Sequence, residues 1–208
     1  MNKLGAAQGL LVLCLATVTV GWAATIRTVQ IDRQDGRYVL VSDTFLQAPP
    51  NAVFRVLTDY DQFARISSVF EESRFVGPDD DGTPLVYTRV EGCVWFFCKT
   101  MERVERLEFT APDFIATTAL PARSDFRYSR SEWQLSPEGD NGTRVLYRLE
   151  MEPDFWIPPV LGPMILKRKL VQGGADAVTR IEVLAKQLRA PVQAELNRWP
   201  EARTSDID

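Results

Sequence analysis

Residues 150–159 read EMEPDFWIPP and decide the fold, because this proline-rich aromatic segment joins an alternating strand to one long helix. The strand, expected over 144–152, places apolar residues on one face and mostly charged residues on the other, which is typical of a sheet with one covered face. The amphipathic helix is expected over 159–189. A sheet that leads through such an elbow into a terminal helix wraps around that helix and usually encloses a pocket. We therefore consider a buried apolar ligand before any catalytic motif.

Further strands are expected upstream, separated by turns rich in Gly, Pro and Asp. Pro49-Pro50 opens a short helix, and a second short helix is expected over 60–66. The strand before the last one changes phase, which predicts a β-bulge near 129–131. Gly173 and Gly174 lie inside the terminal helix, where each costs about 1 kcal/mol of helix propensity, so we expect a kink, a close approach to the sheet or room for a ligand. The expected upstream strands are 26–31, 38–46, 71–76, 84–91, 97–109, 113–120 and 125–135.

The composition is that of a globular chain of one domain: 208 residues, 45% hydrophobic and 25% charged. The formal net charge of −4 argues against nucleic acid as a partner and against electrostatic docking on anionic lipid. Histidine is absent, which excludes a Ser-His-Asp triad, a Cys-His dyad and any histidine-ligated metal site. We expect no metal, no cofactor and no catalytic residue that the spacing singles out.

The first residues are typical of a signal peptide. Lys3 precedes an apolar run over 10–20 that is short for a membrane span, and Gly21 and Ala23 are small residues at the expected cleavage site. We predict a signal peptide over 1–23, a domain over 24–190 and a polar tail over 191–208, and hence an exported protein, periplasmic or secreted. A retained membrane anchor is the alternative.

Cys93 and Cys98 are the cysteines outside the expected signal peptide. Export makes a disulfide plausible, but a continuous strand between them would span about 16 Å, whereas a disulfide needs Cα atoms within about 7 Å. Either the chain turns between them and they bond, which we favour, or the strand continues and both stay free thiols.

Four segments resemble the START-like, or helix-grip (SRPBCC), superfamily, which includes the polyketide cyclase/dehydrase and coenzyme-Q-binding groups. Residues 48–61 read APPNAVFRVLTDYD and are similar to its first helix and the turn after it. Residues 127–135 and 143–147, followed by 155–159, are similar to its last two strands and the start of its helix. The resemblance covers residues 38–189. It implies an α+β fold in which about six to seven antiparallel strands wrap around a long C-terminal helix, with two short helices after the first strand.

The expected pocket is lined by large apolar side chains. Phe155 and Trp156 lie at its mouth, either as a gate or as a hydrophobic staple that sets the angle of the helix. Aromatic residues 95–97 form a hairpin tip that either touches a bilayer transiently or packs as core. Arg89, Glu91, Glu102 and Arg103 either add polar contacts or form surface ion pairs. The expected ligand-binding residues are Trp95, Phe97, Tyr128, Trp133, Tyr147, Met151, Trp156, Met164 and Ile165.

The prediction from sequence is therefore an exported, monomeric protein that binds an apolar small molecule such as a lipid, an acyl chain or an isoprenoid quinone. Burial of each CH₂ group contributes about 0.8 kcal/mol, so sequestration needs no catalysis. One alternative is an enzyme of the cyclase/aromatase or hydrolase kind that uses the same cavity. Another is an interaction module whose cavity is filled by its own side chains.

Overall fold

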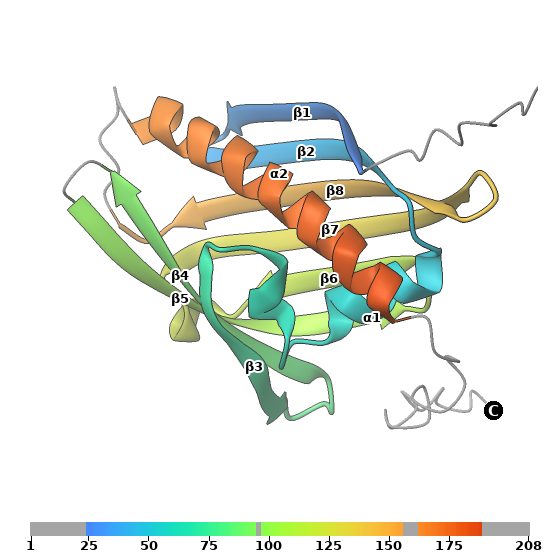
Figure 1. The fold of residues 1–208 in the computed structure, drawn as a ribbon. Helices are drawn as coiled ribbons and strands as arrows, with labels where there is room; N and C mark the ends of the chain where they lie inside the picture. The colour runs from blue at the N-terminus through green and yellow to red at the C-terminus, as the bar shows by residue number, and fades with distance from the viewer. Residues whose placement is uncertain (1–23, 95–96, 156–161, 189–208) are drawn as a thin grey trace, which may run out of the picture.

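The computed structural model describes residues 24–94, 97–155 and 162–188 (Figure 1). The expected signal peptide, the polar tail, Trp95 and Trp156 lie outside these residues. The side chains of Cys93, Phe97, Met164 and Ile165 also lie outside what the structure describes.

The sheet is a single antiparallel layer of eight strands in the order β1-β2-β8-β7-β6-β5-β4-β3, so the first strand and the third form its edges (Figure 1). Every predicted strand is present, and several are longer than expected. The sheet therefore has more strands than the six to seven that the resemblance implies. The strands are β1 (Thr25–Gln34), β2 (Arg37–Leu46), β3 (Phe70–Pro78), β4 (Pro84–Val94), β5 (Phe97–Thr110), β6 (Phe114–Ala119), β7 (Phe126–Glu138) and β8 (Gly142–Pro153).

The helices follow the sequence signals. Helix α1 (Pro50–Thr58) begins at a proline, which has no N–H to satisfy, and the carbonyl of Pro49 accepts its first hydrogen bonds. Two short 3-10 helices follow, η1 (Phe63–Ile66) and η2 (Pro121–Arg123). Helix α2 (Gly162–Gln187) crosses one face of the sheet and reaches α1 with its C-terminal half (Figure 1). We call this covered face of the sheet the inner face.

Two apolar clusters pack on the inner face. The first apolar cluster joins α1, η1 and the second half of α2 to the sheet, and it includes Leu46, Val53, Leu57, Val86, Leu107, Ile115, Leu135, Val145 and Ile181. The second apolar cluster lies at the opposite end of β2 and β8, near the elbow before α2. Its buried members are Tyr38, Leu40, Phe126, Leu149 and Met151, with Met101 and Tyr147 packed against them.

The predicted bulge is present in β7, but it lies closer to the start of the strand than expected. The register with β8 shifts between Phe126 and Tyr128, not near residues 129–131. Phe126 therefore faces inward with Ser129 and Trp133, whereas Tyr128 faces outward, where the guanidinium carbon of Arg37 lies 3.8 Å from its ring centroid.

Two carboxylates of α2 hold the helix to the loops beside it. Asp176 Oδ2 accepts hydrogen bonds from the backbone N–H and the hydroxyl of Ser68, both at 3.1 Å. Glu182 Oε2, on a buried side chain, accepts the backbone N–H of Gln47 at 2.7 Å. The second half of α2 is thus fixed by specific polar contacts as well as by apolar packing.

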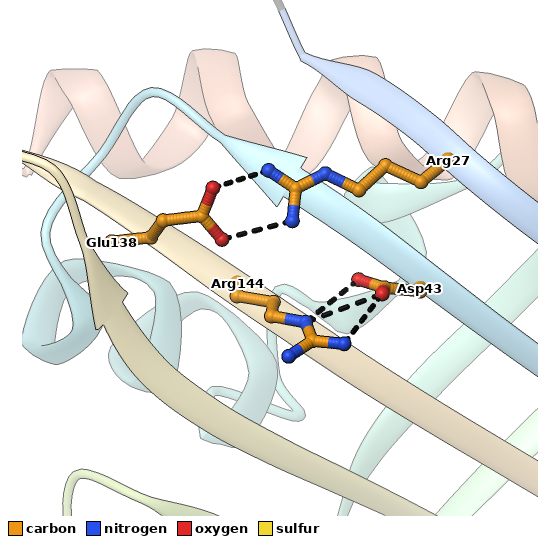
Figure 2. Close-up of polar contacts among 4 residues, drawn as sticks. All are labelled: Arg27, Asp43, Glu138 and Arg144. Atoms are coloured by element: carbon orange, nitrogen blue, oxygen red, sulfur yellow. Dashed lines mark hydrogen bonds and ion pairs between the residues drawn. The ribbon is translucent and has the colours of Figure 1, made fainter.

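The outer face of β1, β2, β7 and β8 carries charges in alternating order (Figure 2). Arg144 Nη2 on β8 donates to Asp43 Oδ2 on β2 at 2.7 Å. Arg27 on β1 forms two hydrogen bonds and an ion pair with Glu138 on β7, so this pair joins the first and the last of the four strands. The hydrogen bond from Arg144 lowers the pKa of Asp43. The four side chains thus form two ion pairs that lie side by side over β2 and β8.

The pairing of β4 with β5 bears on the two alternatives for the cysteines. Strands β4 and β5 form a hairpin in which Cys93 lies directly opposite Cys98. A disulfide between Cys93 and Cys98 requires this backbone arrangement. The alternative, one continuous strand that runs through both cysteines, does not agree with the pairing of β4 with β5.

Candidate functional site

A cluster of polar side chains is buried on the inner face between the two apolar clusters. It is formed by residues that share their strand face with core residues: Thr88 lies two positions from Val86, and Glu105 two positions from Leu107. Four neighbouring strands contribute. We call this group the buried polar cluster: Thr88, Arg103, Glu105, Thr117, Ser129 and Ser131.

Hydrogen bonds and one ion pair join most of the buried polar cluster into one network. The hydroxyl of Thr117 contacts Glu105 Oε1 at 3.1 Å and Ser131 Oγ at 2.6 Å. Arg103 Nη1 donates to Ser129 Oγ at 3.3 Å, and Arg103 Nε lies 3.8 Å from Glu105 Oε2. Glu105 is only 2% exposed, so Arg103 supplies the opposite charge that a carboxylate needs at this depth.

Two polar atoms of the cluster are left without a hydrogen-bond partner. They are Thr88 Oγ1 and Arg103 Nε, both shielded from solvent by the described residues. Thr88 and Arg103 lie directly opposite each other on β4 and β5 and therefore project from the same face of the sheet. Buried polar groups are nearly always paired, so each of these two atoms without a hydrogen-bond partner indicates a place where water or a ligand supplies the missing contact.

Two tyrosines border the buried polar cluster. Burial raises the pKa of Tyr60 well above its ordinary value, and the nearby charge of Glu105 adds to this effect. Burial also raises the pKa of Tyr147, against the opposing influence of Arg103. Both phenols therefore stay protonated at neutral pH and act as hydrogen-bonding groups, not as bases.

Apolar side chains enclose the cluster. The guanidinium carbon of Arg103 lies 5.5 Å from the ring centroid of Phe126, a member of the second apolar cluster. On the other side, Tyr60 stacks on Phe63 with 4.4 Å between ring centroids, within the first apolar cluster. The polar groups thus lie between two apolar regions under α2.

The structure brings three of the predicted ligand-binding residues to the inner face. Trp133 and Tyr147 lie next to each other, with ring centroids 4.8 Å apart, and Met151 is buried in the second apolar cluster. Tyr128 is not among them, because the bulge turns it outward into a shallow hollow between charged residues of β7 and β8. Phe97, Met164 and Ile165 lie on β5 and α2, but their side chains, like Trp95 and Trp156, are outside the described part of the chain.

The four charged residues that were expected to add polar contacts also lie on different faces of the sheet. Arg89 pairs with Glu71 and Glu72 on the outside of the sheet, and Glu91 and Glu102 are exposed. Arg103 alone of the four reaches the inner face. The sequence reasoning missed Glu105, although a signal was present: Glu105 lies between Arg103 and Leu107 on the face of the strand that the apolar pattern assigns to the core.

Among the described residues, no group of three His, Cys, Asp or Glu side chains is arranged to bind a metal ion. Within the same part of the chain, no helix combines the length and the apolar character that a membrane crossing requires.

An eight-stranded antiparallel sheet that holds a C-terminal helix on its inner face defines an α+β helix-grip domain of the START-like class. The family described as polyketide cyclase / dehydrase and lipid transport matches residues 38–180. The chain belongs to this family, as the resemblance implied.

Solved structures support the same fold. The Zhui aromatase/cyclase of Streptomyces is 14% identical, with a TM-score of 0.56, over 73% of this chain and 94% of that one. A START superfamily protein of Mycobacterium smegmatis is 15% identical, with a TM-score of 0.57, over 72% and 98%. Human STARD10 is 10% identical, with a TM-score of 0.55, over 82% and 78%. No curated protein matches the chain. At these identities the likeness shows the fold alone.

Proposed function

We propose that this protein is exported and binds an apolar small molecule, such as a lipid, an acyl chain or an isoprenoid quinone, between the sheet and α2. The observation that carries the proposal is the buried polar cluster, with two unpaired polar atoms, between two apolar clusters. Sites for small molecules are mostly apolar and contain a few placed polar groups. Membership of a family described by lipid transport and polyketide chemistry supports the same ligand class.

Binding under α2 requires no chemistry from the protein. The apolar part of the ligand leaves water, which contributes about 0.8 kcal/mol for each CH₂ group, and the polar cluster selects among ligands of similar size. The contacts of Asp176 and Glu182 hold the second half of α2 to the loops beside it.

Native mass spectrometry of the protein purified from its exported compartment, followed by organic extraction, tests this proposal. We expect a discrete added mass that extracts as a lipid or a quinone. A bare chain that also takes up no member of a panel of lipids and quinones would contradict it. The same spectrum should show the loss of two hydrogen atoms if, as we propose, Cys93 and Cys98 form a disulfide.

A second candidate is an enzyme of the cyclase/aromatase kind, favoured by the presence of Arg103, Glu105 and two neutral tyrosines in one enclosed region. Tyr147→Phe separates the two candidates. A binding protein loses at most some affinity when this hydroxyl is removed, whereas an enzyme that uses it as a proton donor loses turnover while it still binds the substrate.

A further inference from the structure

Positive and negative charges are unevenly distributed along this chain, although its formal net charge is −4. Residues 92–101 contain no acidic residue and one cation, Lys99. Residues 155–175 also contain no acidic residue, and their positions 167–169 read KRK. The two segments therefore carry four cations and no negative side chain of their own.

The fold brings these two segments to one end of the molecule. The first includes the end of β4 and the start of β5, and the second leads into α2; Figure 1 shows the start of α2 and the β4–β5 hairpin at the same end. The segments are in contact, because Lys99 Nζ lies 4.7 Å from the ring centroid of Phe155. We call this surface the elbow end: Lys99, Phe155 and the α2 residues Lys167, Arg168 and Lys169.

Acidic residues next to the two segments have another partner or another orientation. Asp154 accepts a hydrogen bond from Arg127 at 2.7 Å and forms an ion pair with it. In the pairing of β4 with β5, Lys99 lies opposite Gly92, so Glu91 projects from the other face of the sheet. These two carboxylates therefore leave the positive charge of the elbow end in place.

The stability of α2 gives no local reason for its cluster of cations. A helix is stabilised by acidic residues near its N-terminus and by basic residues near its C-terminus, because its backbone carries partial charges at its ends. Helix α2 has no acidic residue in its first turn, and Lys167, Arg168 and Lys169 follow in its second turn. Arg168 is exposed to solvent. This placement suits an anionic partner outside the chain.

We propose that the elbow end binds the surface of a bilayer that contains anionic phospholipid. Lipid headgroups present many negative charges in one plane, which fits cations that come from separate segments of the chain. Beside Lys99, Phe155 adds an aromatic ring of the kind that interfacial segments place at the boundary between headgroups and acyl chains. The net charge predicts no such docking for the molecule as a whole, but this end of it differs from the average.

Co-sedimentation with vesicles tests the proposal, using phosphatidylcholine alone and an equal mixture of phosphatidylcholine and phosphatidylglycerol. We expect the protein to sediment only with the mixed vesicles, and to sediment less as added salt screens the charges. Equal sedimentation with both kinds of vesicle, or with neither, overturns the proposal. Displacement from the mixed vesicles by duplex DNA at the same phosphate concentration also overturns it, because the cations would then prefer a nucleic acid.

Paired variants assign the binding to the elbow end. Lys99→Gln combined with Arg168→Gln removes one cation from each segment, and we expect it to weaken binding to the mixed vesicles by about 25-fold, since each cation near an anionic surface contributes about fivefold. Arg65→Gln combined with Arg180→Gln is the matched control, because it removes the same charge beside the second half of α2. It should change binding by less than about twofold. Equal weakening by both pairs would show that total charge decides, and the proposal would be wrong.

This proposal and the proposed function fail separately. If a lipid or quinone is extracted from the protein but the variant at Lys99 and Arg168 binds vesicles as the wild-type protein does, only the docking proposal is wrong. If the elbow end binds mixed vesicles but the chain neither carries nor takes up a ligand, the docking proposal stands and the proposed function is wrong.

Discussion

Glu105 and Arg103 place a buried ion pair in an otherwise largely apolar interior. Both lie on the face of β5 that also carries the apolar Leu107, and they are stabilised by each other and by hydroxyl groups from β6 and β7. Such a pair contributes little net stability compared with apolar residues of the same size, but loss of one partner leaves a buried charge uncompensated. The pair therefore fits a role in selecting a ligand better than a role in folding.

Glu105→Gln should therefore destabilise the protein by about 2 to 4 kcal/mol, because Arg103 then keeps its charge with no carboxylate beside it. Urea denaturation measures the change in the free energy of unfolding. Glu108→Gln is the matched control on the same strand, since Glu108 is exposed, and it should change stability by less than about 0.5 kcal/mol. Equal effects of the two substitutions would show that Arg103 does not depend on Glu105.

At the scale of elements, two glycines should respond in opposite directions to the same substitution. A Cβ at Gly142 would lie 2.5 Å from the carbonyl oxygen of Glu138 and 2.5 Å from the ring of Phe45, so Gly142→Ala should cost about 1 to 3 kcal/mol. A Cβ at Gly174 meets nothing within 4 Å, so Gly174→Ala should stabilise α2 by up to about 1 kcal/mol. Thermal unfolding checks both signs, and destabilisation by Gly174→Ala would contradict the open space beside that glycine.

The contact between α2 and the loop before β3 should depend on pH through Asp176. Hydrogen bonds from Arg180 and from the backbone N–H of Ser68 lower the pKa of this carboxyl. Its contribution is therefore complete above the ordinary pKa of aspartate, about 3.9, and is lost as the pH falls through the lower folded value. Because the side chain is 34% exposed, the contribution is no more than about 1 kcal/mol.

Asp176→Asn is the variant that measures this contribution. The difference in unfolding free energy between the wild-type protein and Asp176→Asn should be constant from neutral pH to about pH 5 and should shrink below the ordinary pKa of aspartate. A difference that grows as the pH falls would mean that the pKa is raised in the folded protein and that the assignment of these hydrogen bonds is wrong.

At the scale of the whole molecule, the order of strands predicts the order of local opening. Strands β8 and β7 lie in the interior of the sheet and are paired on both sides, whereas β1 is an edge strand with mostly exposed side chains. Hydrogen–deuterium exchange should therefore be slowest in β7 and β8 and faster in β1. Protection of β1 equal to that of β8 would indicate an additional partner along its free edge.

Much of this architecture follows from local sequence pattern, and the remainder depends on contacts between distant segments. The strands, α1 and the terminal helix were predicted because periodicity and proline positions act within a few residues. The place of the bulge in β7 depends on how β8 pairs with it, so the change of phase was visible in the sequence but the outward turn of Tyr128 was not. Glu105 was missed because a buried carboxylate becomes plausible only once Arg103, Thr117 and Ser131 are known to surround it.

The ion pair between Arg27 and Glu138 has a mechanical consequence. It lies near the end of β1 at which the chain enters the sheet, and it ties this edge strand to β7 across β2 and β8 (Figure 2). A force applied at Thr25 across the strand direction would peel β1 from β2 one residue pair at a time, starting beside this ion pair. Arg27 therefore adds to the force needed to begin unfolding from the N-terminal side, and its contribution decreases as added salt screens the pair.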